Sequence, residues 1–412
     1  MSSDHQETGR SVLILSNSFC GGGAEVVARI MAETIENSSC VLFENDAGIT
    51  VAERRVKVAF HQYQAGIVFT ILVSIWRTTV IQWEKLRLRP SVTISHLEGP
   101  NFANMLTVLG GARVLFVHNR ISQNYRKNDP RDRLKRYLCR VLYIRADKLV
   151  AVSPGVAREL KKLFEIPKDK ILILPNPIDR DAITQAATRH YGDDRDDLTS
   201  QKYLVSVASL TEQKNHQLML EAYKKFIAIS LESGQFKLVL IGDGPERYRL
   251  KEICRALELR ISDSEQDQSI NLDAQVFFLG FQNNPYRLIK RAQLLLMTSL
   301  WEGLPIALLE AMSLGIPSVV SDCSEGIRDL WQVPPESVMT EDTVPFLDTA
   351  FGVLLSIQSD RTVAATYWAQ AMERLVTNPN RRWGYARACQ TRAAEYDVQK
   401  VKQLWNQQLG CS

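Results

Sequence analysis

Short apolar runs rich in β-branched residues alternate along the chain with longer amphipathic stretches, and this alternation constrains the possible folds more than any other feature. Such runs are typical of strands that are buried on both faces of a parallel sheet. Strands that alternate with helices in this way predict a doubly wound α/β fold class. The runs lie at 11–15, 91–95, 113–117, 148–152 and 171–174, and again at 203–208, 237–241, 276–279, 294–297 and 318–321.

The two series of strands indicate two domains. A chain of 412 residues is too long for one ordinary core, and the polar segment 179–202, which contains GDDRDDLTSQK, separates the series. We predict a Rossmann-like N-terminal domain at 1–178 and a second one at 179–390, with 179–202 as a linker and a cleft between the domains. A C-terminal helix at 391–412 is expected to pack back on the N-terminal domain. Ligands of open parallel sheets bind beyond the carboxyl ends of the strands.

The composition is that of a folded chain in a reducing, cytoplasmic compartment. Hydrophobic residues make up 45% and charged residues 23% of the chain, which excludes disorder and collagen-like repeats. The seven cysteines are scattered and form no C-x-x-C pair, so neither a disulfide framework nor a zinc site is indicated. The polar start, MSSDHQETGR, does not resemble a secretory signal. The most apolar stretch, 65–76, is shorter than the ~20 residues that span a bilayer.

The charge is unevenly distributed. Residues 1–180 hold 26 Lys and Arg against 17 Asp and Glu, a net charge of +9, whereas the remainder holds 24 against 29, a net charge of −5. The segment 113–148 is especially basic, which suits phosphates or anionic lipid, and is equally compatible with a solvated helix face. Because no nucleic-acid-binding motif or aromatic platform accompanies it, nucleic acid is disfavoured as a partner.

A glycine-rich loop follows the first predicted strand. Residues 16–25 read SNSFCGGGAE, and the glycines allow backbone N–H groups and the next helix start to approach an anion. The dinucleotide fingerprint G-x-G-x-x-G is absent, so a nicotinamide cofactor is not supported. The loop is also compatible with a merely flexible connection, and Glu25 with a first-turn residue favoured by the helix dipole.

Two loops of the second half carry candidate donor-binding residues. Lys214, in SLTEQKNH after the run 203–208, is placed to act as a point charge for phosphate. Asp243 lies in the turn GDGPE after the run 237–241, and its alternative role is to stabilise that turn. Each of these signals is weak by itself.

The stretch 299–312, SLWEGLPIALLEAM, is the most informative. Pro305 suits the first helical position, so Gly303 and Leu304 are expected to present free backbone donors of a helix start to an anion. Glu310 follows in an apolar run, where a carboxylate needs a partner. A ribose diol and a local arginine are both possible partners.

Together these motifs resemble the family-4 retaining glycosyltransferases of the GT-B fold. The resemblance covers nearly the whole chain, through SNSFCGGGAE, ILPNPID, LTEQKNH, VLIGDGPER, FLGFQNNPY and SLWEGLPIALLEAMSLGIPSVVSD. Glu302 and Glu310 form the E-x7-E signature, with G-L-P between them. The resemblance implies a retaining hexosyltransferase whose donor, a nucleotide-sugar, is a co-substrate held mainly by the C-terminal domain. We expect a UDP-sugar. No cofactor is implied.

The resemblance also implies roles for individual residues. In the C-terminal domain, Glu310 would hold the ribose, Lys214 would neutralise the diphosphate, and the backbone at Phe281 would meet the base. The sugar hydroxyls and diphosphate would also be held by Glu302 and by the backbone of Gly303, Leu304 and Pro305. In the N-terminal domain, Gly22 and Gly23 would approach the diphosphate, and His118 in LFVHNR would lie near the reacting sugar, unless it is a core histidine.

One position departs from the family pattern. The family commonly has G-R-L before the lysine motif, with the arginine on the diphosphate, and here the equivalents are Ala208, Ser209 and Leu210. The loss of that cation puts donor affinity in doubt or shifts the task to another residue such as Arg120. A catalytically weak protein that acts as a binding partner therefore stays an alternative, as does a nucleotide-sugar epimerase.

The family reacts on one face of the sugar, so catalysis is expected to depend on positioning and on stabilisation of the departing diphosphate. The strings Asp179-Arg180-Asp181 and Asp194-Arg195-Asp196 lie in the predicted linker. We interpret them as chance, and no metal is expected.

The acceptor is predicted from the N-terminal half. The segment 64–89 has a helical pattern with Trp76 and Trp83, and its basic residues suit a membrane surface. The order of motifs is similar to the branch that extends saccharides on polyprenyl diphosphate. We therefore expect a saccharide or polyprenyl-diphosphate-saccharide acceptor, used in cell-surface polysaccharide, lipopolysaccharide or glycan synthesis at the inner face of the cytoplasmic membrane. A core helix whose charges face water is the alternative. The candidate acceptor or membrane residues are Arg77, Lys85, Arg87, Arg89 and Arg120.

Overall fold

The computed structural model describes residues 11–19, 21–44, 56–58, 67–125, 129–266, 269–334, 336–337, 339 and 346–409. The polar start of the chain, residues 64–66 of the predicted membrane helix and Arg126 and Lys127 of the basic segment lie outside the described residues. The chain divides into two compact units. The first is Met1–Pro177 with Val398–Ser412, and the second is Ile178–Asp397.

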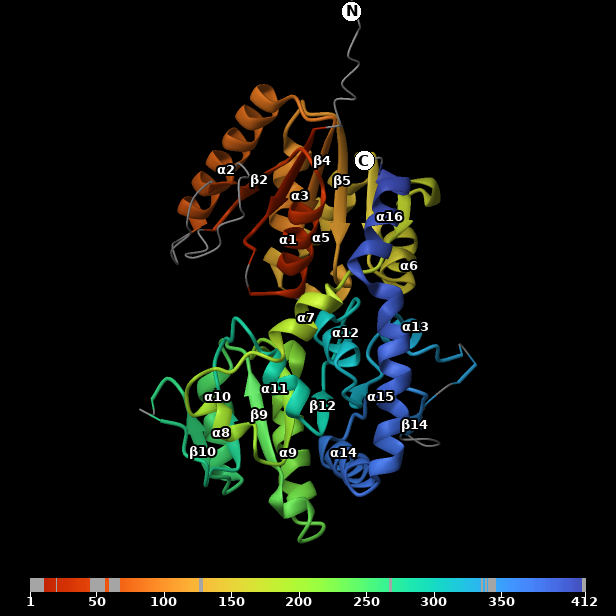
Figure 1. Cartoon of the computed structure of the whole chain (residues 1–412). Helices are drawn as coiled ribbons and strands as arrows, with labels where there is room; N and C mark the ends of the chain where they lie inside the picture. Colours follow the sequence, from red (N-terminus) through yellow and green to blue (C-terminus); the bar gives the residue numbers. More distant parts are fainter. Residues whose placement is uncertain are drawn as a thin grey trace, which may run out of the picture. The chain divides into compact units, whose positions relative to one another are not determined.

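The first unit contains a parallel sheet of seven strands in the order β3-β2-β1-β4-β5-β6-β7 (Figure 1). β1 lies at the point where the strand order reverses, between β2 and β4. The inner strands are buried along almost their whole length, as their apolar sequences require. The strands are β1 (Val12–Ser16), β2 (Ser38–Leu42), β3 (Val56–Val58), β4 (Val92–His96), β5 (Ala112–Val117), β6 (Lys148–Ala151) and β7 (Ile171–Ile173).

Helices cover this sheet. α1 contacts β1, β2 and β4, α3 contacts β1, β4 and β5, and α6 contacts β6 and β7. The C-terminal helix α16 packs against α1 and buries Val401 and Trp405 completely. The helices of this unit are α1 (Gly23–Thr34), α2 (Ile67–Leu88), α3 (Glu98–Leu106), α4 (Ile121–Asn124), α5 (Pro130–Tyr143), α6 (Pro154–Leu163), η1 (Lys168–Lys170) and α16 (Val398–Leu409).

The second unit contains a sheet of eight strands in the order β10-β11-β9-β8-β12-β13-β15-β14. Neighbouring strands are parallel except β14 and β15, which form an antiparallel edge pair. The strands are β8 (Tyr203–Val207), β9 (Lys237–Ile241), β10 (Ile261–Asp263), β11 (Val276–Phe278), β12 (Leu294–Met297), β13 (Ser318–Ser321), β14 (Phe346–Asp348) and β15 (Gly352–Leu355).

The core of the second unit lies between this sheet and its helices. α14 packs against α9 and against β12, β13 and β15, and Trp368 of α14 and Phe226 of α9 are buried there. The helices are α7 (Arg180–Ala186), α8 (Arg195–Leu198), η2 (Glu212–Lys214), α9 (His216–Ile227), η3 (Ser233–Gln235), α10 (Arg247–Ala256), α11 (Tyr286–Arg291), α12 (Ile306–Ser313), α13 (Glu325–Leu330), α14 (Arg361–Val376), α15 (Pro379–Ala393) and η4 (Ala394–Tyr396).

The predicted α/β class is confirmed, and each predicted apolar run overlaps a strand. The strands that the sequence pattern did not indicate are β2, β3, β10, β14 and β15, which are short or interrupted by serine, aspartate or glycine. Segment 179–202, expected to be a linker, contains α7 and α8, and α7 packs against α11 and α12 within the second unit. Within the described residues, no helix combines the length and the apolar character that crossing a membrane requires.

Candidate functional site

Two loops of the second unit meet because their strands are neighbours. β8 and β12 pair in parallel, so the loops that follow them begin at the same edge of the sheet. The backbone N–H of Leu300 donates to the carbonyl of Gln213 at 2.8 Å, and the Gln213 side chain donates to the carbonyl of Trp301 at 2.7 Å. The Thr298 hydroxyl donates to the carbonyl of Lys214 at 2.9 Å. These bonds fix the position of the lysine loop relative to the E-x7-E segment.

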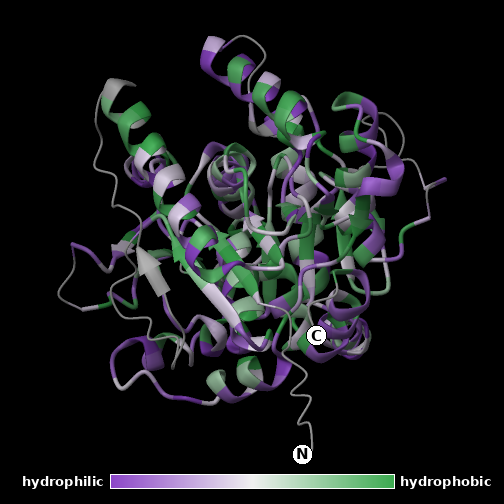
Figure 2. Cartoon of the chain, turned by 90° about the horizontal axis from the view of Figure 1, so that it is seen from above, coloured by the Kyte–Doolittle hydropathy of each residue, from purple (hydrophilic) through white to green (hydrophobic). Residues whose placement is uncertain are grey.

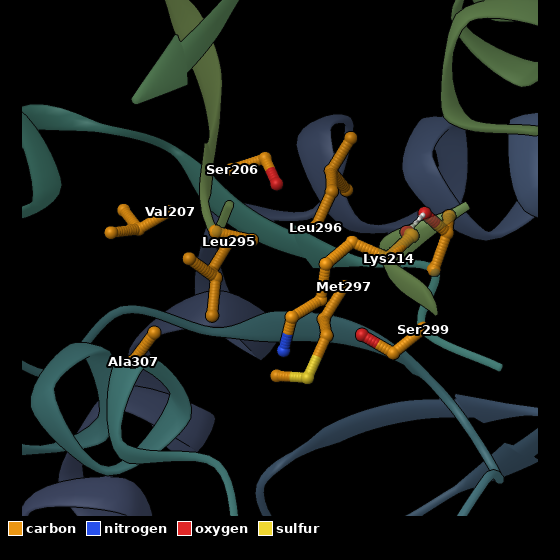
Figure 3. A pocket seen from close by; sticks show the side chains of 10 residues that line it. Ser206, Val207, Lys214, Leu295, Leu296, Met297, Ser299 and Ala307 are labelled. Carbon is orange, nitrogen blue, oxygen red and sulfur yellow. Dashed lines mark hydrogen bonds between the residues drawn. The ribbon is translucent and has the colours of Figure 1, made fainter. Parts of the chain in front are cut away.

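Lys214 and Glu302 form a close ion pair at this edge. Nζ of Lys214 lies 2.5 Å from Oε1 of Glu302, and the Ser299 hydroxyl donates to the same oxygen at 2.7 Å. Only 6% of the Glu302 side chain is exposed, against 20% for Lys214. Figure 3 shows Lys214, Met297 and Ser299 around a pocket that Ala307 of α12 also lines. A cation and a carboxylate that accepts hydrogen bonds from hydroxyl groups therefore lie side by side.

Buried neutral groups lie next to this ion pair. His216, two residues after Lys214, is buried, and burial together with the Lys214 charge lowers the pKa of its imidazole to about 3. Burial, and next the Glu302 charge, raise the pKa of the Cys323 thiol above its ordinary value. Both groups are therefore neutral at pH 7. Charges interact more strongly in such a medium than they do in water.

The helix that follows, α12, begins one residue later than the sequence suggested. Pro305 was expected at the first helical position, but it is the N-cap, with an extended ψ of 119°. Its carbonyl accepts the bond from Leu309 at 3.3 Å, so the free N–H groups of the helix start begin at Ile306. Gly303, Leu304 and Pro305 are buried in the preceding turn. An anion at this edge would meet the start of α12 as well as Lys214.

Glu310 lies in α12 with 9% of its surface exposed, and its carboxylate meets a tyrosine. The hydroxyl of Tyr286, the first residue of α11, donates to Oε1 of Glu310 at 2.9 Å. A ribose diol or an arginine was expected as the partner of this carboxylate from the sequence, and Tyr286 was not. No spacing rule indicates this contact, because the two residues lie on different helices.

The remaining donor-site candidates of the second unit lie after β9 and β11. A Cβ at Gly242 would come within 2.1 Å of the carbonyl oxygen of Ala208, so only glycine fits where the two loops touch. Asp243 Oδ1 accepts from the N–H of Gly244 at 2.7 Å, which is a turn-stabilising bond. Phe281 is 52% exposed. Ser209 is exposed and adds no charge beside Lys214.

In the first unit, Gly22 is the N-cap of α1, and Gly23 is its first residue. A Cβ at Gly22 would lie 2.5 Å from Oε2 of Glu25, so the Glu25 side chain covers the glycine from the first turn of the helix. This placement is the one that the helix dipole favours for a carboxylate.

His118 follows β5 and is buried against a second histidine. Nδ1 of His96 lies 3.0 Å from Nε2 of His118, and the two rings stack with centroids 5.3 Å apart. Burial lowers the pKa of His118 to about 3 and holds that of His96 well below its usual range. Both rings are therefore neutral at pH 7, and one of the two facing nitrogens donates its N–H to the other.

The basic candidates of the first unit are mostly engaged. Arg120 pairs with the buried Glu159, its Nε 3.3 Å from Oε2, and Arg87 pairs with Glu84 at 2.5 Å. Nη2 of Arg77 donates to the carbonyl of Phe43 at 3.1 Å. Arg89 is exposed.

The structure contradicts the position expected for Lys85. It was expected to face a membrane or an acceptor, but it is 1% exposed, and its Nζ donates to Asn104 and Thr107 at 2.7 Å each. Burial, and next the charge of Arg113, lower its pKa to about 7. The side chain points inward because α2 packs against α3, which carries Asn104.

The outer face of α2 is apolar. Trp76 and Trp83 are 55% and 64% exposed, and five further apolar residues of this helix are also exposed. Figure 2 colours much of α2 as hydrophobic. The loop after α3 adds Leu106, Val108 and Leu109, and the N–H of Val108 donates to Gln82 of α2 at 3.0 Å. We call this surface the α2 patch; it consists of Phe69, Ile71, Leu72, Ile75, Trp76, Trp83, Leu86, Leu106, Val108 and Leu109.

The two D-x-D strings have structural roles. Asp179 caps α7, accepting from the N–H of Ala182 at 2.8 Å. Asp194 accepts from the N–H of Ile270 at 2.6 Å, and Asp196 pairs with Arg287. Over the described residues, no three His, Cys, Asp or Glu side chains gather into a group that could hold a metal.

Comparison with known families matches both halves of the chain. Residues 21–182 match the model of Glycosyltransferase Family 4, and residues 193–332 match that of Glycosyl transferases group 1. Together the two models cover most of the chain.

Among similar proteins is a Campylobacter jejuni enzyme named N-acetylgalactosamine-N,N'-diacetylbacillosaminyl-diphospho-undecaprenol 4-alpha-N-acetylgalactosaminyltransferase. It is 26% identical over 308 residues, which are 74% of this chain and 72% of that protein. An Escherichia coli UDP-Gal:alpha-D-GlcNAc-diphosphoundecaprenol alpha-1,3-galactosyltransferase is 29% identical over 167 residues, 40% of this chain and 39% of the relative.

The solved structure of Anabaena HepE in complex with UDP and glucose resembles this chain with a TM-score of 0.72 at 16% identity, over 97% of this chain and 99% of that one. Sucrose-phosphate synthase from Thermosynechococcus elongatus also gives a TM-score of 0.72, at 14% identity, over 98% of this chain and 100% of that one. At these identities the likeness shows the fold.

Proposed function

We propose that this chain, which belongs to the family-4 glycosyltransferases of the GT-B fold, transfers a hexose or N-acetylhexosamine from a UDP-sugar to a lipid-linked saccharide with retention of the anomeric configuration. The observation that carries the proposal is the group at the carboxyl edge of the second sheet. There the Lys214–Glu302 pair joins two neighbouring loops, and α12, which follows the second loop, contributes its start and the buried carboxylate of Glu310. Lys214 and the start of α12 correspond to the diphosphate, Glu302 to the sugar and Glu310 to the ribose.

The donor roles follow from the chemistry of each group. The Lys214 ammonium and the free N–H groups at the start of α12 are donors suited to a diphosphate. Glu302 accepts hydrogen bonds only, which suits sugar hydroxyls, and Glu310 can accept from a ribose diol. Phe281 offers backbone to the base, Asp243 supports the turn beside it, and Gly22 and Gly23 leave room for phosphate in the first unit. His118 is assigned to the reacting sugar.

In the proposed reaction, the acceptor hydroxyl oxygen bonds to the anomeric carbon on the face from which the diphosphate departs. The bond from the anomeric carbon to the diphosphate oxygen breaks, and the acceptor proton passes to that oxygen. Lys214 and the start of α12 stabilise the charge that develops on the leaving group. This chemistry is proposed to require neither a metal nor a cofactor, because the cation and the helix start supply the positive charge.

The experiment that tests the proposal is a transfer assay. The purified chain is incubated with a panel of UDP-sugars and with saccharides linked to undecaprenyl diphosphate, in EDTA and in magnesium, and NMR reads the new anomeric centre. Transfer with retention that persists in EDTA is the expected result. Nucleotide binding without turnover would instead support the binding-partner alternative, and loss in EDTA restored by Mg²⁺ or Mn²⁺ would contradict the metal-independent mechanism.

The acceptor part of the proposal draws on two observations. The relatives from Campylobacter jejuni and Escherichia coli carry diphospho-undecaprenol or diphosphoundecaprenol acceptors in their names. This chain exposes the α2 patch on the first unit, and residues 1–180, nearly all of which belong to that unit, carry a net charge of +9. Indole rings and an excess of basic residues suit the interface of an anionic membrane. We therefore place the chain at the inner face of the cytoplasmic membrane.

Replacing Trp76 and Trp83 by serine is expected to lower the partition of the protein onto anionic liposomes by about tenfold or more, because two indole groups leave the interface. Flotation at low and high salt measures it. Trp383→Ser is the matched control, since Trp383 is 69% exposed but lies in the second unit. Equal flotation of all three proteins would contradict the membrane assignment while leaving the donor site in place.

A further inference from the structure

A group of charged side chains lies under the loops to which the donor base is assigned, and the proposed function does not use it. Arg247 begins α10 directly after the turn that contains Asp243, and 3% of its side chain is exposed. Its Nη2 donates to Oδ1 of Asp263 at the end of β10. Nζ of Lys251 donates to the other oxygen of that carboxylate at 2.6 Å. Two cations thus share one buried carboxylate.

The other two guanidinium nitrogens form ion pairs but no hydrogen bond. Nε and Nη1 of Arg247 are buried and have no hydrogen-bond partner among the residues that the structure describes. Oδ1 of Asp243 lies 3.5 Å from Nη1 and Oε2 of Glu265 lies 3.4 Å from Nε, and these two side chains are 44% and 53% exposed. Buried donors in native proteins usually have a partner, so two such N–H groups on one side chain indicate a missing acceptor.

Gly280 shows where that acceptor would lie. A Cβ at Gly280 would be 3.6 Å from Nη1 of Arg247, so the guanidinium lies against the side-chain-free turn after β11. The N–H of Gly242 donates to the carbonyl of Gly280 at 2.8 Å, which joins this turn to the glycine turn after β9. Phe281, assigned to the base, is the next residue. The donors that lack a hydrogen bond therefore lie where the base of the donor nucleotide is proposed to bind.

We infer that Arg247 is a specificity residue that donates a hydrogen bond to a carbonyl oxygen on the base of the donor nucleotide. The inference rests on the proposed donor site and deepens it. A guanidinium has donors and no acceptor, so it matches the O4 of uracil or the O6 of guanine. Cytosine and adenine present an amino group at the corresponding position, where two donors would face each other. The site should therefore favour uracil and guanine over cytosine and adenine.

The test is calorimetric binding of UDP, GDP, CDP and ADP to the wild type, R247K and K251M. The wild type is expected to bind UDP or GDP at least about tenfold more tightly than CDP and ADP, because a site built around a hydrogen bond rejects an analogue that leaves it unmade. R247K keeps the charge and loses Nη1, so the ratio should fall to about threefold or less. K251M removes the other cation of Asp263 without touching either turn, so it should keep the ratio.

Discrimination that survives in R247K, or that K251M abolishes to the same extent, would overturn the inference. If R247K does not fold, the affinity of the wild type for 4-thio-UDP is measured instead, because this analogue replaces O4 of uracil by sulfur, a weak hydrogen-bond acceptor. If the wild type binds 4-thio-UDP as tightly as UDP, Arg247 does not donate to O4. If the wild type binds all four nucleotides equally and still transfers the sugar, the role of Arg247 is wrong but the proposed function stands. A wild type that binds none of them removes the proposed function together with it.

Discussion

Replacing Lys214 by alanine is expected to lower kcat/KM by about 100- to 1,000-fold, the range found when one preorganised donor to a developing charge is removed. The effect is expected to be large because Lys214 has no second cation beside it at Ser209. Ser209 adds no charge beside Lys214, and within the described residues Lys214 is the cation that forms the ion pair with Glu302. Steady-state transfer rates with a UDP-sugar measure the effect.

A double variant separates the effect on catalysis from the effect on folding. Lys214→Ala leaves the buried Glu302 with the Ser299 hydroxyl alone, which costs about 1–3 kcal/mol of stability. Lys214→Ala combined with Glu302→Gln removes the unpaired charge and should recover most of that stability without recovering turnover. If the double variant regains turnover as well, Lys214 acts on Glu302 rather than on the diphosphate.

The parts of the site that could be predicted from the sequence are those set by backbone topology. Parallel strands buried on both faces give continuous apolar runs, and their carboxyl ends share one edge of the sheet. The loops that carry Lys214 and Glu302 could therefore be placed together from the order of strands, as the pairing of β8 with β12 shows. Short edge strands such as β3 and β10 lack this signal because three residues are too few to show a period.

The parts that could not be predicted are side-chain contacts between elements far apart in the chain. The helical pattern of 64–89 indicated an amphipathic helix, but which face is buried depends on α3, and so Lys85 was placed on the wrong side. Likewise, Tyr286 and Glu310 meet because α11 and α12 lie next to each other. Burial of a charge is a property of the packed structure, since it needs partners from several elements.

The contact between Tyr286 and Glu310 leads to a graded prediction for ribose binding. Glu310→Gln should weaken UDP binding by about 10- to 100-fold, because a charge-assisted hydrogen bond contributes about 1.5–3 kcal/mol. Tyr286→Phe removes only the hydroxyl that holds Oε1 at 2.9 Å. It should weaken binding by about 2- to 10-fold, because the carboxylate loses a contact that orients it but can still accept from the diol. Calorimetric titration with UDP measures both variants.

A UDP analogue without the ribose diol tests whether Glu310 binds the ribose. UDP and its 2′,3′-dideoxy analogue should differ in affinity for the wild type, differ less for Tyr286→Phe, and bind almost equally to Glu310→Gln, because that variant no longer presents a carboxylate to the diol. Tyr248→Phe is the matched control, since the Tyr248 side chain belongs to the same unit and is 73% exposed. If Glu310→Gln still prefers UDP over the dideoxy analogue as strongly as the wild type does, the carboxylate holds α11 to α12 and does not bind the ribose.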